Sequence, residues 1–177
     1  MTIAIALAIH EAGHLIAAIL LKIKMQRVKI TLFGFNLNVD LDETGLMQKI
    51  ILFSAGPLIN ISVFYALRST EYNNFAEINK FLSLVNMIPI VPLDGGNICK
   101  SVLESFVNYS SVCRYMIMTN CFFIICFFVL IYLYRYWLFM LLILMALRGI
   151  IDEKRHLLER SIKYNYYKKI KRKNKAH

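Results

Sequence analysis

The sequence predicts an all-α polytopic membrane protein with about five transmembrane helices and a short membrane-associated β-hairpin after the first helix. Of its 177 residues, 58% are hydrophobic, the mean hydropathy is +0.54, and the apolar residues gather in long runs. Soluble domains are about half apolar, whereas ~20 apolar residues make a helix that crosses the ~30 Å hydrocarbon core. We expect a transmembrane core at 1–150 and a basic cytoplasmic tail at 151–177.

Five apolar runs are the candidate spans. The first is predicted to be a retained helix, because it lacks the basic start and the small-residue cleavage site of a signal peptide. Pro57 should kink the second, and the third contains VNMIPIVPLDGGN, whose prolines and glycines cannot sit in an unbroken helix. Such backbone must be buried in protein or face water. The spans cover about 2–21, 48–67, 78–103, 112–134 and 136–150.

The stretch VKITLFGFNLNVDLD, from Val28 to Asp42, alternates apolar and polar residues around Gly34. Alternation with period two indicates strands, so a short hairpin is predicted here. A covering loop is the alternative.

The formal net charge of +10 comes from basic residues that lie beside apolar runs and in the tail. This pattern favours anionic lipid headgroups and argues against nucleic acid as a partner. The basic bias places the first connection and the tail in the cytoplasm, with the N-terminus outside. The four cysteines form no CxxC pair, so neither a zinc knuckle nor a disulfide framework is expected.

The first run contains the motif HEAGH. His10 and His14 are four residues apart, so on a helix they share a face and can bind one Zn²⁺. Glu11 between them is suited to take a proton from a water activated by the metal. The motif alone occurs by chance in about two chains per hundred of this length. However, an unpaired charge near the bilayer midplane costs at least ~2.5 kcal/mol, and a bound cation compensates it.

A catalytic zinc takes three protein ligands and keeps a fourth position open. Asp94 is the acidic residue in the apolar part of the third span, within the broken backbone of PLDGG, and is the candidate third ligand. Capping of a half-helix after Pro92 is the alternative role for this carboxylate, and both roles can coexist.

Together these motifs resemble the site-2 protease family of intramembrane zinc metalloproteases, whose signatures are HExxH and a later NxxPxxPxxDG. The second matches Asn86, Pro89, Pro92, Asp94 and Gly95. The resemblance implies that His10, His14 and Asp94 ligate one zinc per chain and that Glu11 is the general base.

Asn86 is implied to orient substrate or stabilise the oxyanion, although a membrane asparagine commonly bonds between helices as well. Asn60 has the same two possible roles. The hairpin is implied to present an edge to an extended substrate.

Within the family, HEAGH, SAGPL, VNMIPIVPLDGG and RHLLERSIKY are most similar to the sporulation branch, which releases a sigma factor from a membrane-tethered pro-form. That branch usually has a span before the HExxH helix and often a nucleotide-sensing domain, and neither is expected for this sequence. The resemblance implies a bacterial membrane location, a site open to the cytoplasm, a pro-sigma factor client and a membrane inhibitor as a possible partner. The alternatives are another client, namely an anti-sigma factor or a signal-peptide remnant, and a metal-binding membrane protein without hydrolytic function.

Overall fold

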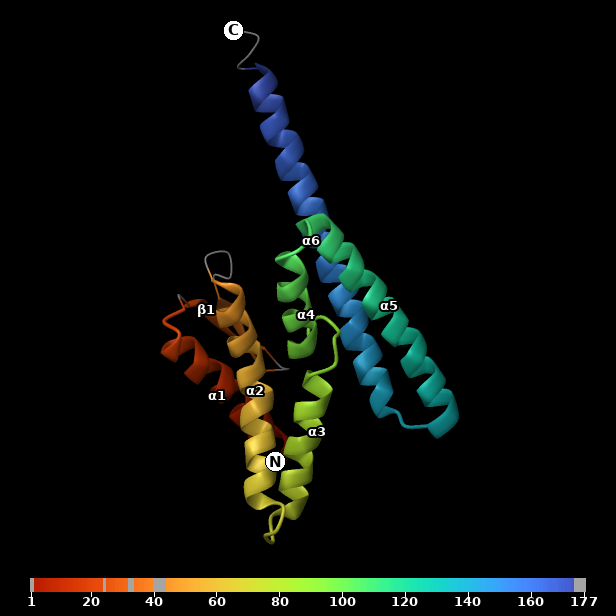
Figure 1. The fold of residues 1–177 in the computed structure, drawn as a ribbon. Coiled ribbons are helices and arrows are strands. Elements are labelled where there is room, and N and C mark those ends of the chain that lie inside the picture. The colour runs from red at the N-terminus through yellow and green to blue at the C-terminus, as the bar shows by residue number, and fades with distance from the viewer. Residues whose placement is uncertain (1, 24, 32–33, 40–43, 174–177) are drawn as a thin grey trace. The chain divides into compact units, whose positions relative to one another are not determined.

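The computed structural model describes residues 2–23, 25–31, 34–39 and 44–173. The chain divides into two compact units, and each is considered by itself. The first unit comprises Met1–Pro89 and Leu93–Ser105, and the second comprises Ile90–Pro92 and Phe106–His177. In order along the chain (Figure 1), the elements are α1 Thr2–Leu20, β1 Met25–Thr31, β2 Gly34–Val39, α2 Leu46–Leu67, α3 Asn73–Asn86, α4 Asp94–Glu104, α5 Tyr109–Tyr134 and α6 Leu138–Lys173.

Helices α1 and α2 pack together in the first unit. Their contacts follow antiparallel order, because His14 contacts Leu52, whereas Gly56, one turn later on α2, lies against both His14 and His10. Nearby, Ala17, Ala18, Ile23 and Leu52 form a buried apolar cluster. Small residues let membrane helices approach closely. This close approach brings α2 against the histidines of α1.

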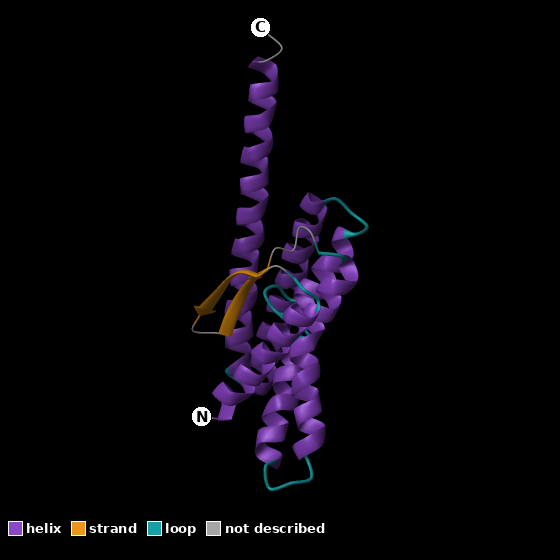
Figure 2. Cartoon of the chain, turned by 90° about the vertical axis from the view of Figure 1, so that its left-hand side faces the viewer, coloured by secondary structure: helices purple, strands orange, loops and turns teal. Residues whose placement is uncertain are grey.

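Two short strands follow α1. Strands β1 and β2 pair in antiparallel fashion, with Val28 opposite Leu37 and Thr31 opposite Gly34, and they are drawn in orange in Figure 2. β1 begins at Met25, three residues before the alternating stretch that we singled out in the sequence, and β2 ends at Val39. The register is irregular between Met25 and Arg27, because the pairing shifts there.

The predicted third span is two separate helices. α3 ends at Asn86 and α4 begins at Asp94, with the proline-containing segment between them. A side-chain carbon on Gly95 would overlap the backbone oxygens of Met87 and Ile88, so the chain folds back tightly here and only glycine fits. At the other end of α4, Glu104 accepts a 3.3 Å hydrogen bond from Lys49 of α2. These contacts fix both ends of the helix that begins with Asp94.

In the second unit α5 packs against α6. This unit also contains Ile90–Pro92, which is held by a polar side chain of α5. Asn120 of α5 is fully buried. Its side chain accepts a 3.2 Å bond from the Val91 N–H and donates to the carbonyls of Val91 at 2.9 Å and Ala146 at 3.1 Å. One asparagine therefore ties two helices to the segment that ends two residues before Asp94.

The expectation of about five transmembrane helices is wrong. In the part of the chain that the structure describes, three helices are long and apolar enough to cross a membrane: α1, α2 and α5. α3 and α4 have 14 and 11 residues, which at 1.5 Å per residue give ~21 and ~17 Å, well short of ~30 Å. α6 begins apolar, but Asp152, Glu153 and Lys154 follow closely on Arg148.

Candidate metal centre

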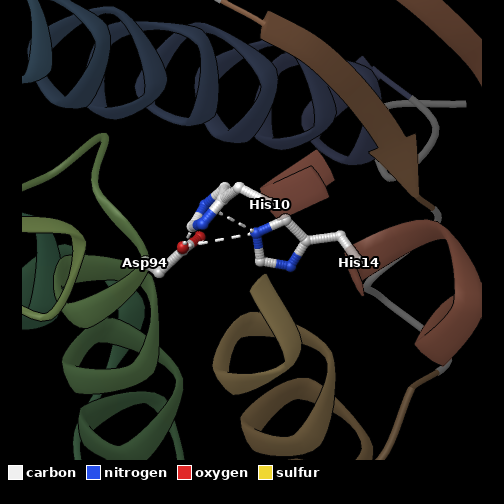
Figure 3. A group of neighbouring side chains, drawn as sticks. All are labelled: His10, His14 and Asp94. Atoms are coloured by element: carbon white, nitrogen blue, oxygen red, sulfur yellow. Dashed lines mark hydrogen bonds and ion pairs between the residues drawn. The ribbon is translucent and has the colours of Figure 1, made fainter. Parts of the chain in front are cut away.

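Three side chains from two helices of the first unit meet at one point. Figure 3 shows His10 and His14 of α1 converging with Asp94, the first residue of α4. The Asp94 Oδ2 lies 3.0 Å from the Nε2 of His10 and 3.3 Å from the Nε2 of His14, and the two Nε2 atoms are 3.2 Å apart. Both histidines are buried, and the carboxyl group is 12% exposed.

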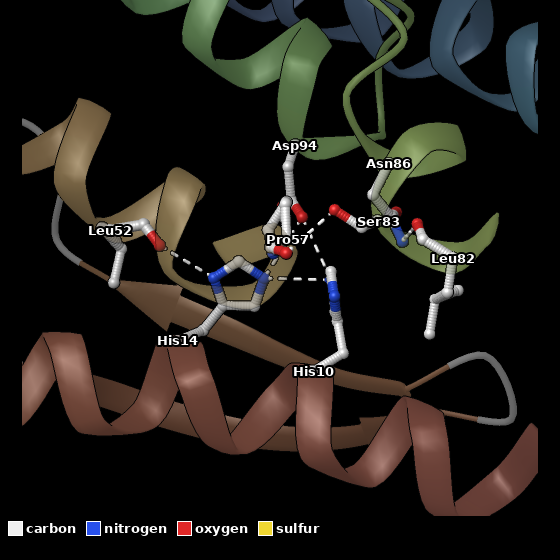
Figure 4. Close-up of polar contacts among 8 residues, drawn as sticks. All are labelled: His10, His14, Leu52, Pro57, Leu82, Ser83, Asn86 and Asp94. Atoms are coloured by element: carbon white, nitrogen blue, oxygen red, sulfur yellow. Dashed lines mark hydrogen bonds and ion pairs between the residues drawn. The ribbon is translucent and has the colours of Figure 1, made fainter. Parts of the chain in front are cut away.

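The tautomer of His14 follows from a backbone contact. Its Nδ1 lies 2.8 Å from the carbonyl oxygen of Leu52 on α2 (Figure 4). A carbonyl oxygen only accepts, so Nδ1 carries the proton, and in a neutral ring Nε2 is then a bare lone pair. That lone pair faces the carboxylate oxygen of Asp94. Two such acceptors repel each other, unless the imidazole is protonated or a cation lies between them.

The donor set and its spacing fit a divalent metal. Tetrahedral coordination at ~2.0–2.1 Å from each ligand places the ligand atoms roughly 3.3–3.4 Å apart. The three separations here are 3.0, 3.2 and 3.3 Å. Two imidazole nitrogens and one carboxylate oxygen are also a ligand set that catalytic zinc accepts, with a fourth position left open. The bond from His14 to the Leu52 carbonyl is the outer contact that orients metal-binding imidazoles.

Glycine at position 56 makes room for both imidazoles. A side-chain carbon there would lie 2.7 Å from the Cε1 of His14 and 2.8 Å from the Cε1 of His10, well inside van der Waals contact. The sequence motif SAGPL contains this glycine, but nothing in the pattern assigned it a steric role. The Leu52 carbonyl was missed as well, because a backbone group leaves no side-chain signal in a sequence.

The other predicted site residues are Glu11, Asn86 and Asn60. Glu11 is half-buried on α1, next to His10 in the chain. The side-chain amide of Asn86 donates a 3.0 Å bond to the Leu82 carbonyl within α3, as Figure 4 shows. Asn60 of α2 is fully buried, and within the described chain neither of its side-chain polar atoms has a hydrogen-bond partner. The structure therefore brings together His10, His14 and Asp94, and gives Asn86 an intrahelical bond.

α3 contacts α2 directly beside the cluster. The hydroxyl of Ser83 donates a 2.9 Å bond to the carbonyl of Pro57, the residue after Gly56. This bond holds α3 against the part of α2 that faces the histidines. It is a second helix-to-helix contact that the sequence did not indicate.

Comparison with known proteins finds relatives of part of this chain. No family model matches the chain. A Synechocystis protein named as a zinc metalloprotease is 28% identical over 106 residues, which are 53% of this chain and 28% of that protein. Stage IV sporulation protein FB of Bacillus subtilis is 28% identical over 127 residues, which are 64% of this chain and 43% of that protein. The chain spans less than half the length of these curated relatives.

A solved structure shares the fold. The site-2 protease from Methanocaldococcus jannaschii superposes with a TM-score of 0.69 over 86% of this chain and 75% of that one, at 19% sequence identity. At this identity the match speaks for the fold alone. Together with its three apolar helices, it shows that this chain is a membrane protein.

Proposed function

We propose that this chain is an intramembrane zinc endopeptidase of the site-2 protease family. One observation supports the proposal most directly: the Nε2 atoms of His10 and His14 and the Oδ2 of Asp94 lie 3.0–3.3 Å apart, at a spacing that suits tetrahedral zinc. The sequence HEAGH adds a carboxylate next to the first histidine. A carboxylate in that place serves as a proton acceptor for hydrolysis.

In this proposal His10, His14 and Asp94 hold one zinc ion per chain. When bound, the ion would lower the pKa of water and polarise the scissile carbonyl. Glu11 takes the proton from the attacking water and delivers it to the leaving amine. The Leu52 carbonyl keeps the Nε2 of His14 free for the metal by holding the ring proton on Nδ1.

Asn86 has one amide hydrogen in use, in its bond to the Leu82 carbonyl. A primary amide has two hydrogens, so the second is available to the developing oxyanion or to the substrate backbone. We assign Asn86 this supporting role. Its intrahelical bond orients the amide and does not by itself prevent the assignment.

The client that we propose is a membrane-tethered pro-sigma factor. The support is the sequence similarity to a protein that carries sporulation in its name and the order of shared motifs from HEAGH to RHLLERSIKY. The basic tail at 151–177 suits the cytoplasmic headgroup layer, so the site is proposed to open to the cytoplasm of a bacterial cell. A membrane inhibitor protein is the expected regulatory partner.

The test uses wild type and Glu11→Gln, each co-expressed with an epitope-tagged, membrane-tethered pro-sigma factor. Immunoblotting detects the shortened product, and metal analysis of the purified proteins gives the zinc content. We expect the product only with wild type and equal zinc in both proteins, because the amide is similar in size to the carboxylate but cannot accept the proton. Cleavage by Glu11→Gln would exclude Glu11 as the base.

A second set of outcomes tests the protease activity independently of the proposed substrate. Wild type that holds one zinc per chain and cleaves another membrane-tethered protein, such as an anti-sigma factor, would retain the protease and replace the pro-sigma factor. Wild type that holds zinc and cleaves none of a panel of tethered substrates would favour a metal-binding membrane protein without hydrolytic function.

A further inference from the structure

Five buried polar atoms of the first unit have no hydrogen-bond partner in the described part of the chain. One is the Oδ2 of Asp94, which faces the two histidines of the metal centre. The other four are the Nδ1 of His10, both side-chain polar atoms of Asn60, and the Oδ1 of Asn79. Asn60 and Asn79 are fully buried, and His10 is 4% exposed. An orphaned buried group destabilises the fold, so native proteins almost always pair such groups, with protein or with ordered water.

The helix contacts place these atoms in one region. On α1 and α2, His10 lies against Gly56, and Asn60 lies one turn beyond Gly56, ~6 Å along the axis. In the antiparallel order of these helices, Asn60 is therefore level with the part of α1 between His10 and Ala6, which is fully buried.

α3 supplies the third member in the same way. Ser83 bonds to Pro57, and Asn79 lies one turn before Ser83 on α3. The hairpin of α2 and α3 runs antiparallel, so Asn79 comes opposite Asn60. Fully buried Ala76 lies close by on the same helix.

The two histidines differ in their outer contacts. His14 donates its Nδ1 proton to the Leu52 carbonyl at 2.8 Å, whereas the Nδ1 of His10 is buried and has no such acceptor among the described residues. Imidazoles that bind metal through Nε2 almost always donate the other ring proton to a carboxylate, a carbonyl or a water. The acceptor for the Nδ1 proton of His10 should therefore involve the unpaired atoms of Asn60 and Asn79.

We propose that Asn60, with Asn79, holds an internal water that accepts the Nδ1 proton of His10. The water donates its two hydrogens to the Oδ1 atoms of Asn60 and Asn79, so three of the orphaned atoms become paired. A single water bridges polar atoms roughly 4.5–5.5 Å apart, which suits groups separated by one helical turn. Buried waters typically make about three such bonds. Asn60 is then a positioning residue for His10, and this inference rests on the proposed zinc site.

The experiment measures zinc affinity and apo-protein stability separately. Wild type, Asn60→Leu, Asn60→Ser and Asn79→Leu are purified in detergent, and Zn²⁺ is titrated in competition with a chromogenic chelator. Co²⁺ substitution reports ligand geometry through its visible absorption, and thermal unfolding of the metal-free proteins reports stability. Ser62→Ala is the matched control on α2, because this exposed hydroxyl bonds only to the Leu58 carbonyl of its own helix among the described contacts.

We expect Asn60→Leu to weaken zinc binding roughly 10- to 100-fold, the usual effect of losing an outer-shell partner. The Co²⁺ spectrum should change, while the metal-free protein should lose less stability than the drop in zinc affinity corresponds to, because leucine also removes the Asn60 amide nitrogen, which the water leaves unpaired. Asn60→Ser should keep the affinity within about fivefold, since a hydroxyl with room beside it still holds a water. Asn79→Leu should weaken binding in the same direction as Asn60→Leu.

Unchanged zinc affinity and an unchanged Co²⁺ spectrum in both leucine variants would overturn the proposal. So would a loss of stability in the metal-free leucine variants that accounts for all of their lost affinity, because that is the result of a purely structural asparagine. His10→Ala is the separate control for the zinc site. If that variant binds zinc as wild type does, the metal centre itself is wrong, whatever the asparagine variants show.

Discussion

Replacement of Gly56 by alanine tests the geometry of the metal centre with one carbon atom. The added Cβ would lie 2.7 Å from the Cε1 of His14 and 2.8 Å from the Cε1 of His10. Carbon atoms pack at about 3.5–4.0 Å, so each ring must move by roughly 0.7–1.3 Å or α2 must shift away from α1. Metal sites tolerate only about 0.2 Å in ligand distance.

The direction of the change distinguishes overpacking at the metal centre from the ordinary effect of alanine on helix stability. In an unconstrained helix, glycine to alanine stabilises by about 1 kcal/mol. Here the overpacking should cost about 1–3 kcal/mol, which corresponds to a roughly 5- to 140-fold loss of zinc affinity at 1.4 kcal/mol per tenfold. The assay is competition for Zn²⁺ with a chromogenic chelator, alongside circular dichroism to show that the helices remain.

The same helix provides the control. A side-chain carbon on exposed Gly45, the N-cap of α2, would come near only the Gln48 Oε1, at an ordinary 3.7 Å. Gly45→Ala should therefore bind zinc as wild type does. Wild-type zinc affinity in Gly56→Ala would refute the close packing of α2 on the two imidazoles.

Three further predictions follow from the contacts. Zinc removal by a chelator should lower the unfolding temperature, because an ion at 100 times its Kd stabilises by about 2.7 kcal/mol; metal titration back into the apo-protein checks this. Asn120→Ala should destabilise by roughly 1–3 kcal/mol for each orphaned backbone group of Val91 and Ala146, which thermal unfolding will show. Ser83→Ala should cost about 0.5–1.5 kcal/mol through its lost bond to Pro57, and denaturation of a Ser83→Thr control should show a smaller loss.

The residues of the metal centre could be selected from the sequence because their signals are local. Spacing of four puts His10 and His14 on one face of a helix, and Asp94 was selected as an acidic residue among broken, apolar backbone. The structure brings these three side chains together. Their roles as zinc ligands, and that of Glu11 as the base, remain predictions for the experiments above.

The span count failed because hydropathy measures composition and not where a helix stops. The apolar stretch at 78–103 contains enough apolar residues for one crossing, yet the helix ends at Asn86 and restarts at Asp94. The tight approach of Gly95 to the Met87 and Ile88 carbonyls depends on three-dimensional packing. The same holds for Gly56, whose role depends on which helix lies opposite. Pairwise contacts between helices have no counterpart in a single sequence.

The bond from His14 to the Leu52 carbonyl has a consequence for mutational scanning. Every amino acid at position 52 carries the same carbonyl, so replacing the leucine side chain tests only the packing with Ala17 and Ala18. A complete substitution scan would record position 52 as a core residue and miss its part in fixing a ring tautomer. An amide-to-ester exchange that weakens this one acceptor would reveal it. The orientation of His14 therefore depends on the course of the α2 backbone and not on which side chain stands at position 52.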